Sequence, residues 1–180
     1  MFDAAELELF IEEGASWAAA RNGLLHREGR PLAPGVVARF SSFFPADTLA
    51  RIRVVPVPAI PNPDFYRVLA SRGTRIPLDF TFMSALTLVD TVLVSTKRAD
   101  FNAERFERLL FHEAVHVMQY EVLGLSRFMR EYVVGWASAG FSYEKIPIEI
   151  QAYALERRFA EDGEPFSVER EVSASAGLVP

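Results

Sequence analysis

The order of helix-like and strand-like patterns along this 180-residue chain predicts an α+β fold. Apolar side chains recur at helical spacing over residues 3–22. Residues 78–83 and 86–96 are rich in Thr, Val, Leu and Phe, which is typical of strands. Helical patterns return from residue 102 to residue 161. The strands therefore lie between two blocks of helices, as α+β folds require.

The first half of the chain contains the shorter predicted elements. Asp3 can cap the first helix, and a second short helix is expected over residues 35–44. Residues 51–57, RIRVVPV, alternate like a strand. The stretch PVPAIPNPDF has four prolines in ten residues and predicts extended loop. A short helix over residues 64–72 follows.

Three helices are expected in the second half, at residues 102–123, 126–139 and 147–161. Asn102 is a suitable cap for the first of them, and Gly124 marks its end. Pro147 suits the first turn of the last helix, and Gly163 ends it.

The chain length favours one domain, which we place at residues 1–163. Residues 164–180 are weakly patterned, and we expect them to form a mobile C-terminal tail.

Composition narrows the functional classes. The net charge is −5 and no cluster of five or more Lys or Arg occurs, so a nucleic-acid partner is not expected. No uncharged run near the motif is long enough for a membrane span, and MFDAAELELF lacks the basic region of a secretory signal. With no cysteine, any metal must be held by His, Asp or Glu, and we expect a cytoplasmic protein.

The segment FHEAVHVMQY contains two of the three histidines, His112 and His116. Residues four apart lie on one face of a helix, with Cβ atoms about 5–6 Å apart. The two imidazoles can therefore bind one ion, while Glu113 lies about 100° round the helix and can reach water on that ion without ligating it.

The surroundings of the motif strengthen this interpretation. The helix is apolar on nearly every side, which predicts a buried helix. The apolar residues are Leu109, Leu110, Phe111, Ala114, Val115, Val117, Met118, Val122 and Leu123. Two histidines and a glutamate are costly in such a helix unless something satisfies them. A bound metal ion would satisfy these side chains. Hydrogen bonds within a metal-free core, with both histidines bonded and Glu113 paired, would also satisfy them. We favour the metal.

A catalytic zinc site needs a third protein ligand. His26 lies far upstream in a polar loop, so a downstream carboxylate is the natural choice. The candidates are Glu121, Glu131, Glu144, Glu149 and Glu156. Glu121 lies about 140° from His116 on the same helix and faces elsewhere. Charged neighbours place Glu131 and Glu144 in solvent.

The segment IPIEIQAYALERRF carries the two remaining candidates. Its packing stripe consists of Ile148, Ala152, Leu155 and Phe159. Glu149 flanks this stripe in the first turn, directly after the rigid Pro147, and Glu156 lies on nearly the same face two turns on. We favour Glu149 and keep Glu156 as the alternative.

With HEAVH and a glutamate in a later helix, residues 86–160 resemble the zincin-like metallopeptidases of the gluzincin type. The segments LLFHEAVHVMQYEVLG and PIEIQAYALE are similar to small bacterial zincin-like domains. The resemblance implies a small mixed sheet packed on the buried motif helix, with further helices after it. It also implies zinc held by His112, His116 and Glu149, with Glu113 as general base in the hydrolysis of a peptide or protein substrate.

The resemblance implies two further roles and contains one departure. Tyr143 or Tyr132 would stabilise the oxyanion, because a phenol can donate a hydrogen bond; we select Tyr143. The strand Thr91–Ser95 would bind the substrate backbone at its edge.

Thermolysin-like gluzincins have an Asp four residues after the ligand Glu to orient a ligand histidine. This chain has Tyr153 there, so Glu156 or a backbone carbonyl must serve instead.

Three functions compete on this evidence. The first is a zinc-dependent peptidase. The second is a zinc-bound domain without proteolytic activity that acts as a binding or regulatory module. The third is a helical domain without metal. We favour the peptidase, because a purely structural zinc site has no use for a buried general base at Glu113.

Overall fold

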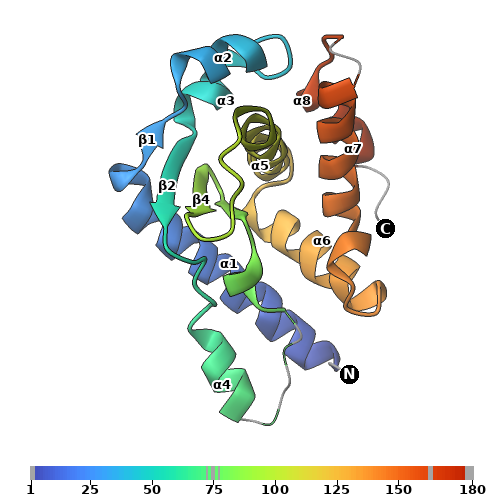
Figure 1. Cartoon of the computed structure of the whole chain (residues 1–180). Coiled ribbons are helices and arrows are strands. Elements are labelled where there is room, and N and C mark those ends of the chain that lie inside the picture. The colour runs from blue at the N-terminus through green and yellow to red at the C-terminus, as the bar shows by residue number, and fades with distance from the viewer. Residues whose placement is uncertain (1–2, 72, 74–75, 77, 162–163, 177–180) are drawn as a thin grey trace.

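The computed structural model describes residues 3–71, 73, 76, 78–161 and 164–176, and it has the predicted mixed α+β character (Figure 1). The helices are α1 Ala4–Leu25, α2 Pro34–Phe40, α3 Ala46–Arg51, α4 Phe65–Ser71, α5 Ala103–Leu123, α6 Leu125–Ser138, α7 Pro147–Glu161 and α8 Val168–Ser175. Three 3-10 turns join them, η1 His26–Glu28, η2 Phe80–Phe82 and η3 Tyr143–Lys145. The strands are β1 Arg30–Pro31, β2 Arg53–Val57, β3 Ala85–Leu88 and β4 Thr91–Ser95.

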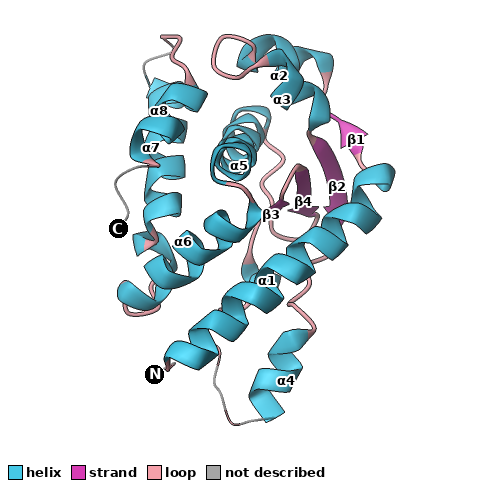
Figure 2. Cartoon of the chain, turned by 180° about the vertical axis from the view of Figure 1, so that it is seen from behind, coloured by secondary structure: helices cyan, strands magenta, loops and turns pink. Residues whose placement is uncertain are grey.

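The four strands form one mixed sheet in the order β1-β2-β4-β3. Strands β2 and β4 are parallel, and the other two pairs are antiparallel. Every residue of β4 is buried, because this strand lies between two neighbours and under helices. Helix α1 crosses the side of the sheet that faces away from the viewer in Figure 1 and toward the viewer in Figure 2. Strand β3 forms one edge of the sheet.

The sequence prediction of strands over residues 78–83 and 86–96 is wrong in two places. Residues 80–82 form η2, because side chains satisfy the backbone there: Asp79 accepts from the amide of Thr81, and Asn62 accepts from the amide of Phe80. The second stretch is a hairpin rather than one strand. It turns at Val89, which has a positive φ of 59°.

Helix α5 lies at the centre of the molecule, with the sheet on one side and α7 and α8 on the other (Figure 1). The predicted boundaries are confirmed: Asn102 accepts from the amides of Glu104 and Arg105, and Gly124 ends the helix with φ 74°. Every residue from 110 to 120 is buried. The motif therefore lies in the interior, as its apolar context predicts.

A cluster of phenylalanines fixes α7 against α5. The rings of Phe111 on α5 and Phe159 on α7 stack with centroids 4.1 Å apart. Four more rings pack against this pair, from Phe40, Phe43, Phe44 and Phe166. Offset and edge-to-face ring pairs contribute about 0.5–1.5 kcal/mol each beyond their buried area. Because Phe111 directly precedes His112, this cluster also sets the position of the motif relative to α7.

The start of α7 is positioned by a close approach to α6. A Cβ atom on Gly135 would lie 2.6 Å from Cδ of Pro147. No side chain larger than hydrogen fits there without a shift, so glycine allows α6 to pack directly on the first turn of α7. Glu149 lies in that turn.

The prediction of a mobile tail over residues 164–180 is wrong for residues 164–176, while residues 177–180 lie outside the described residues. Ser167 caps α8 by accepting from the amide of Arg170. Val168 and Val172 are buried in the same core as Leu110 and Phe111. The helix is only eight residues long, so its apolar stripe is too short to stand out in the sequence. The domain therefore extends beyond residue 163.

The remaining predicted helices are confirmed within a few residues, and Asp3 and Glu6 form a complete capping box on α1. Helix α3 and strand β1 had not been predicted, and both are short. Gly163, the expected end of the last helix, lies outside the described residues.

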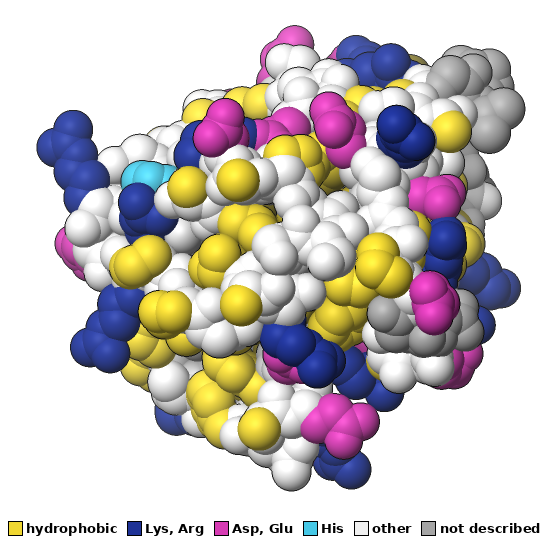
Figure 3. Space-filling model, turned by 90° about the horizontal axis from the view of Figure 1, so that it is seen from above, with side chains coloured by type: hydrophobic (Ala, Val, Ile, Leu, Met, Phe, Trp, Pro, Cys, Tyr) yellow, Lys and Arg dark blue, Asp and Glu magenta, His cyan; other side chains and the backbone are white. Residues whose placement is uncertain are grey.

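None of the described helices is a candidate membrane span, and the face drawn in Figure 3 carries charges of both signs. None of these helices combines the length and the apolar character that a bilayer crossing requires. Figure 3 shows Lys and Arg side chains interspersed with Asp and Glu on the face seen from above, without a broad patch of one sign.

Shortening Val172 to alanine should lower the free energy of unfolding by about 2 kcal/mol, because it removes two buried methyl groups and leaves a cavity. The neighbouring exposed substitution Ser173→Ala is the control and should change stability by less than about 0.5 kcal/mol. Urea denaturation followed by circular dichroism measures both. Equal stabilities of the two variants would show that α8 is not part of the core.

Candidate metal centre

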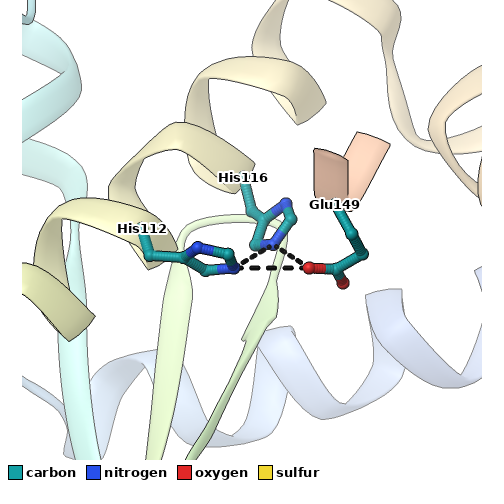
Figure 4. A group of neighbouring side chains, drawn as sticks. All are labelled: His112, His116 and Glu149. Atoms are coloured by element: carbon teal, nitrogen blue, oxygen red, sulfur yellow. Dashed lines mark hydrogen bonds and ion pairs between the residues drawn. The ribbon is translucent and has the colours of Figure 1, made fainter. Parts of the chain in front are cut away.

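Three side chains from α5 and α7 converge at one point in the interior (Figure 4). Nε2 of His112 and Nε2 of His116 are 3.1 Å apart. Oε2 of Glu149 lies 3.3 Å from each of these nitrogens. All three residues are buried, at 5%, 5% and 2% exposure in the same order. The group could hold a metal ion.

The size of this triangle fits a tetrahedral metal. With metal–nitrogen and metal–oxygen bonds of about 2.0–2.2 Å, two ligand atoms of a tetrahedral zinc site lie about 3.3–3.6 Å apart. The two separations of 3.3 Å lie at the lower end of this range, and the separation of 3.1 Å is about 0.2 Å shorter. In addition, Glu149 Oε2 is fully buried without a hydrogen-bond partner in the part of the chain that the structure describes. Burying a carboxylate oxygen without a partner raises the free energy of the folded state, and a bound cation would offset this.

Gln119 fixes the orientation of His116. The Gln119 amide nitrogen donates to the backbone oxygen of Ile148 (3.0 Å) and to Oε1 of Gln151 (2.9 Å). Its oxygen is therefore left to accept from Nδ1 of His116, 2.7 Å away. With the proton on Nδ1, the lone pair of Nε2 points to the other two ligands. Partners of this kind set the tautomer of metal-ligating histidines.

Glu156 lies on the outer side of His112. Its Oε2 is 3.4 Å from Nδ1 of His112, within ion-pair range but outside hydrogen-bond geometry. Arg108 holds the other oxygen of Glu156 through Nε at 3.1 Å. The structure therefore places Glu149 with the two histidines and places Glu156 where it can orient one of them. Tyr153, four residues after Glu149, packs its ring against that of His112 with centroids 4.4 Å apart.

The electrostatics of the triad favour a positive charge. Burial opposes the charged form of Glu149, yet His116 and His112 outweigh burial and hold the pKa of this carboxyl well below its usual range. Burial alone lowers the pKa of His112, but Glu149, Glu156 and the nearby Glu113 carboxylate together raise it to about 10. A proton therefore remains on His112 at neutral pH, and a metal ion must displace it.

The other carboxylates are engaged away from the triad, as the sequence predicts. Glu121 accepts from Thr48 and forms an ion pair with Arg51. Glu131 pairs with Arg127 at 2.7 Å, although its side chain is only 12% exposed rather than solvated. Glu144 is exposed in η3.

Glu113 lies beside the triad but bonds elsewhere. The hydroxyl of Thr87 on β3 donates to its Oε2 at 2.6 Å and lies 3.1 Å from its backbone oxygen. Burial raises the pKa of Glu113, although the two histidines and this hydrogen bond act against it. A raised pKa suits a residue that must accept and later release a proton near neutral pH. Glu113 is therefore paired with Thr87 rather than with the histidines, a pairing that a metal-free core would also need.

Tyrosines surround the triad. All five tyrosines of the chain line one of the two cavities described next, and they are Tyr66, Tyr120, Tyr132, Tyr143 and Tyr153. Burial raises the pKa of both Tyr132 and Tyr143, and the Glu149 carboxylate raises it further. Both phenols therefore keep their protons at neutral pH and can donate hydrogen bonds.

Two cavities meet at the triad. An open groove, with about 800 Å³ available to the centres of water-sized atoms, is lined by His112, Glu113, Tyr143, Tyr153 and Glu156 together with residues 78, 79 and 82–85. A smaller chamber is lined by Glu113, His116 and Glu149. Leu78, Ala85, Glu113 and Tyr143 line both. The triad therefore lies in the wall between them.

The sequence prediction that Thr91–Ser95 binds substrate at its edge is wrong. This strand, β4, lies inside the sheet between β2 and β3, so its backbone groups are already paired. Strand β3 has the free edge, and Ala85 and the preceding Ser84 line the groove. The residue pattern could not show the order of the strands in the sheet. It indicates that a segment is a strand, but not whether that strand lies inside the sheet or at its edge.

Two residues that hold side chains of the site in place, Gln119 and Thr87, were not predicted from the sequence. Gln119 follows His116 by three residues and so shares its helix face, which is a signal that could have identified it. Thr87 had no signal, because its contact with Glu113 depends on how β3 packs on α5.

Comparison of the chain with protein-family models, with curated proteins and with solved structures gives no match in any of the three. The site must therefore be interpreted from its own geometry.

Replacing a ligand should abolish binding of about one zinc per chain. His112→Ala, His116→Ala and Glu149→Ala each leave two ligands, too few to hold the ion firmly. Glu156→Ala removes only an orienting partner and should weaken zinc binding about 10- to 100-fold, less than Glu149→Ala. Native mass spectrometry and competition with a chelator measure these affinities. The reverse order of the two glutamate variants would identify Glu156 as the ligand.

Metal affinity should rise about tenfold per pH unit from pH 6 to pH 8, since zinc displaces one proton from His112, whose pKa is raised to about 10. A histidine with an ordinary pKa of about 6.5 would give an affinity that levels off above pH 7. Chelator competition in buffers that do not bind zinc measures the slope, and a flat profile above pH 7 would contradict the raised pKa.

Proposed function

We propose that the protein is a zinc-dependent peptidase that resembles the zincin-like enzymes. One observation carries the proposal: Glu113 is buried beside His112, His116 and Glu149 but is held off them by Thr87. A site that only binds zinc has no need for a second buried carboxylate that forms no ion pair with the histidines in the described structure, whereas hydrolysis needs a base in that position.

The proposed chemistry divides between the ion and the chain. Zinc held by His112, His116 and Glu149 would supply a Lewis acid for the substrate carbonyl and a water with a pKa of about 7. Glu113 takes the proton from the attacking water and passes it to the leaving nitrogen. The hydrogen bond from Thr87 holds one carboxylate oxygen, so the other is free to face the reacting groups. The raised pKa of Glu113 helps it to carry the proton between these steps.

Tyr143 and strand β3 complete the site in this proposal. Tyr143 lines both the groove and the chamber, and its phenol keeps the proton that a hydrogen bond to the oxyanion requires. Tyr132 lines only the chamber and is the second choice. An extended substrate can add to the free edge of β3, where backbone hydrogen bonds would place its carbonyl near Glu113.

A second function is favoured by one observation. His112, Glu113 and His116 are each only 5% exposed. A closed site of this kind fits a zinc-bound module that binds or regulates a partner without proteolysis. The groove that reaches His112 and Glu113 favours the peptidase instead.

The substitution Glu113→Gln separates the two functions. It should leave zinc binding intact and lower the rate of peptide hydrolysis about 10²- to 10⁴-fold, because the general base is lost while the ligands remain. The control is Glu121→Gln on the same helix, which should leave the rate unchanged, because Glu121 bonds to Thr48 and Arg51.

The measurement uses the zinc-loaded protein with a mixed peptide library, and mass spectrometry detects the cleavage products. Equal cleavage by wild type and Glu113→Gln would contradict the role of this residue. A zinc-loaded wild type that cleaves none of the library would favour the non-proteolytic module.

A further inference from the structure

The chamber beside the triad has the size and the walls of a pocket for one side chain. About 60 Å³ of it is open to the centres of water-sized atoms, at least four times the volume that one water needs. This is far less than in the groove, so a stretch of peptide cannot enter. Ten of the described residues that line it are Phe, Tyr or Trp, among them Phe10, Trp17, Phe65, Tyr66, Phe80 and Trp136. Walls of this kind select an apolar or aromatic group.

Two hydrogen-bond donors in this wall have no partner. Nε1 of Trp17 and the hydroxyl of Tyr66 are fully buried atoms that make no hydrogen bond with any described residue. Both rings pack against Phe80, each with a centroid separation of 6.0 Å, so both lie next to Phe80 in the chamber wall. A buried donor without a hydrogen-bond partner lowers the free energy of unfolding, and phenylalanine at either position would remove the donor. Both donors are therefore better explained by a ligand than by folding.

The chamber and the groove are adjacent where the chemistry is proposed to occur. Leu78 and Ala85 lie in the walls of both cavities, together with Glu113 and Tyr143. A side chain of a peptide that lies in the groove along the edge of β3 would have to enter the chamber past these shared residues.

We infer that the chamber binds one aromatic side chain of the substrate, and that Trp17 and Tyr66 donate hydrogen bonds to a polar atom at its tip. Among natural side chains, tyrosine has this combination: a flat apolar ring and a terminal oxygen with two lone pairs. The inference names the substrate class of the peptidase and rests on that proposed function, although the binding itself requires neither zinc nor catalysis.

The protein contains its own reporter of the chamber. Its two tryptophans, Trp17 and Trp136, both line this cavity, so all tryptophan fluorescence comes from the chamber wall. The probes are p-cresol and toluene, the isolated side chains of tyrosine and phenylalanine. Both should change the emission in a saturable manner, and p-cresol should bind about three- to tenfold more tightly for each hydrogen bond made.

The deciding variant is Tyr66→Phe, which removes one oxygen and keeps the ring. It should weaken p-cresol about three- to tenfold, leave toluene unchanged, and leave the melting temperature of the free protein equal or higher, because an unpaired buried hydroxyl is lost. The matched control is Tyr153→Phe, since Tyr153 lines only the groove. It should change neither probe.

Two results would overturn the inference. If p-cresol gives no saturable change, the chamber is a packing void. If Tyr66→Phe lowers the melting temperature and leaves p-cresol binding unchanged, the hydroxyl has a structural partner. Both titrations can be run on metal-stripped protein, wild type and Tyr66→Phe, so a failure of the peptidase function does not obscure them.

A final arm tests whether the ligand belongs to a peptide. Blocked pentapeptides with Tyr, Phe or Ala between glycines are titrated into zinc-loaded Glu113→Gln, in which hydrolysis is not expected. The Tyr peptide should bind most tightly and the Ala peptide least. If p-cresol binds while none of the three peptides does, the chamber accepts free phenols and the assignment to the substrate is overturned.

Discussion

The structure depends on one constraint: a carboxylate from α7 and two imidazoles from α5 must meet at a point where all three side chains are buried. Removing a carboxylate from water costs several kcal/mol after relaxation, and only a nearby positive charge offsets this. Here that charge is a proton on His112 or a metal ion, and it holds the two helices together at one point. The packing around the triad can be understood as the framework that makes this meeting possible.

The framework acts on both helices. On one side of the triad, the ring of Phe111 in the middle of α5 stacks on that of Phe159 in the last turn of α7, and this contact sets the distance between the two helices. At the first turn of α7, the missing side chain at Gly135 lets Pro147 pack directly on α6. These contacts fix the direction of α7 at two points, and Glu149 has little freedom to move away. An ion would therefore find its ligands already in place rather than having to order them.

The features of the fold and of the site that could be predicted from the sequence are those that depend on one short segment of the chain. The spacing of His112 and His116, the cap at Asn102 and the stop at Gly124 are properties of one helix, so the sequence predicted them well. The choice of Glu149 over Glu156 depended on where α7 crosses α5; its position in the first turn favoured it, but only the packing places it 3.3 Å from both histidines. The order of the strands, the support from Thr87 and the helix α8 depend on long-range packing, for which no single stretch carries a signal.

The angular offset within the motif explains why the two cavities meet at Glu113. His112 and His116 share one face of α5, and Glu113 lies about 100° away from His112. That offset turns Glu113 toward β3, where Thr87 binds it, while the histidines face α7. The space between β3 and α7 is thus divided by α5 itself, with the groove reaching His112, the chamber reaching His116, and only Glu113 of the motif lining both. A substrate bound in both cavities would have to pass this residue, so the turn of helix proposed to bind the ion would also set where the substrate lies relative to that ion.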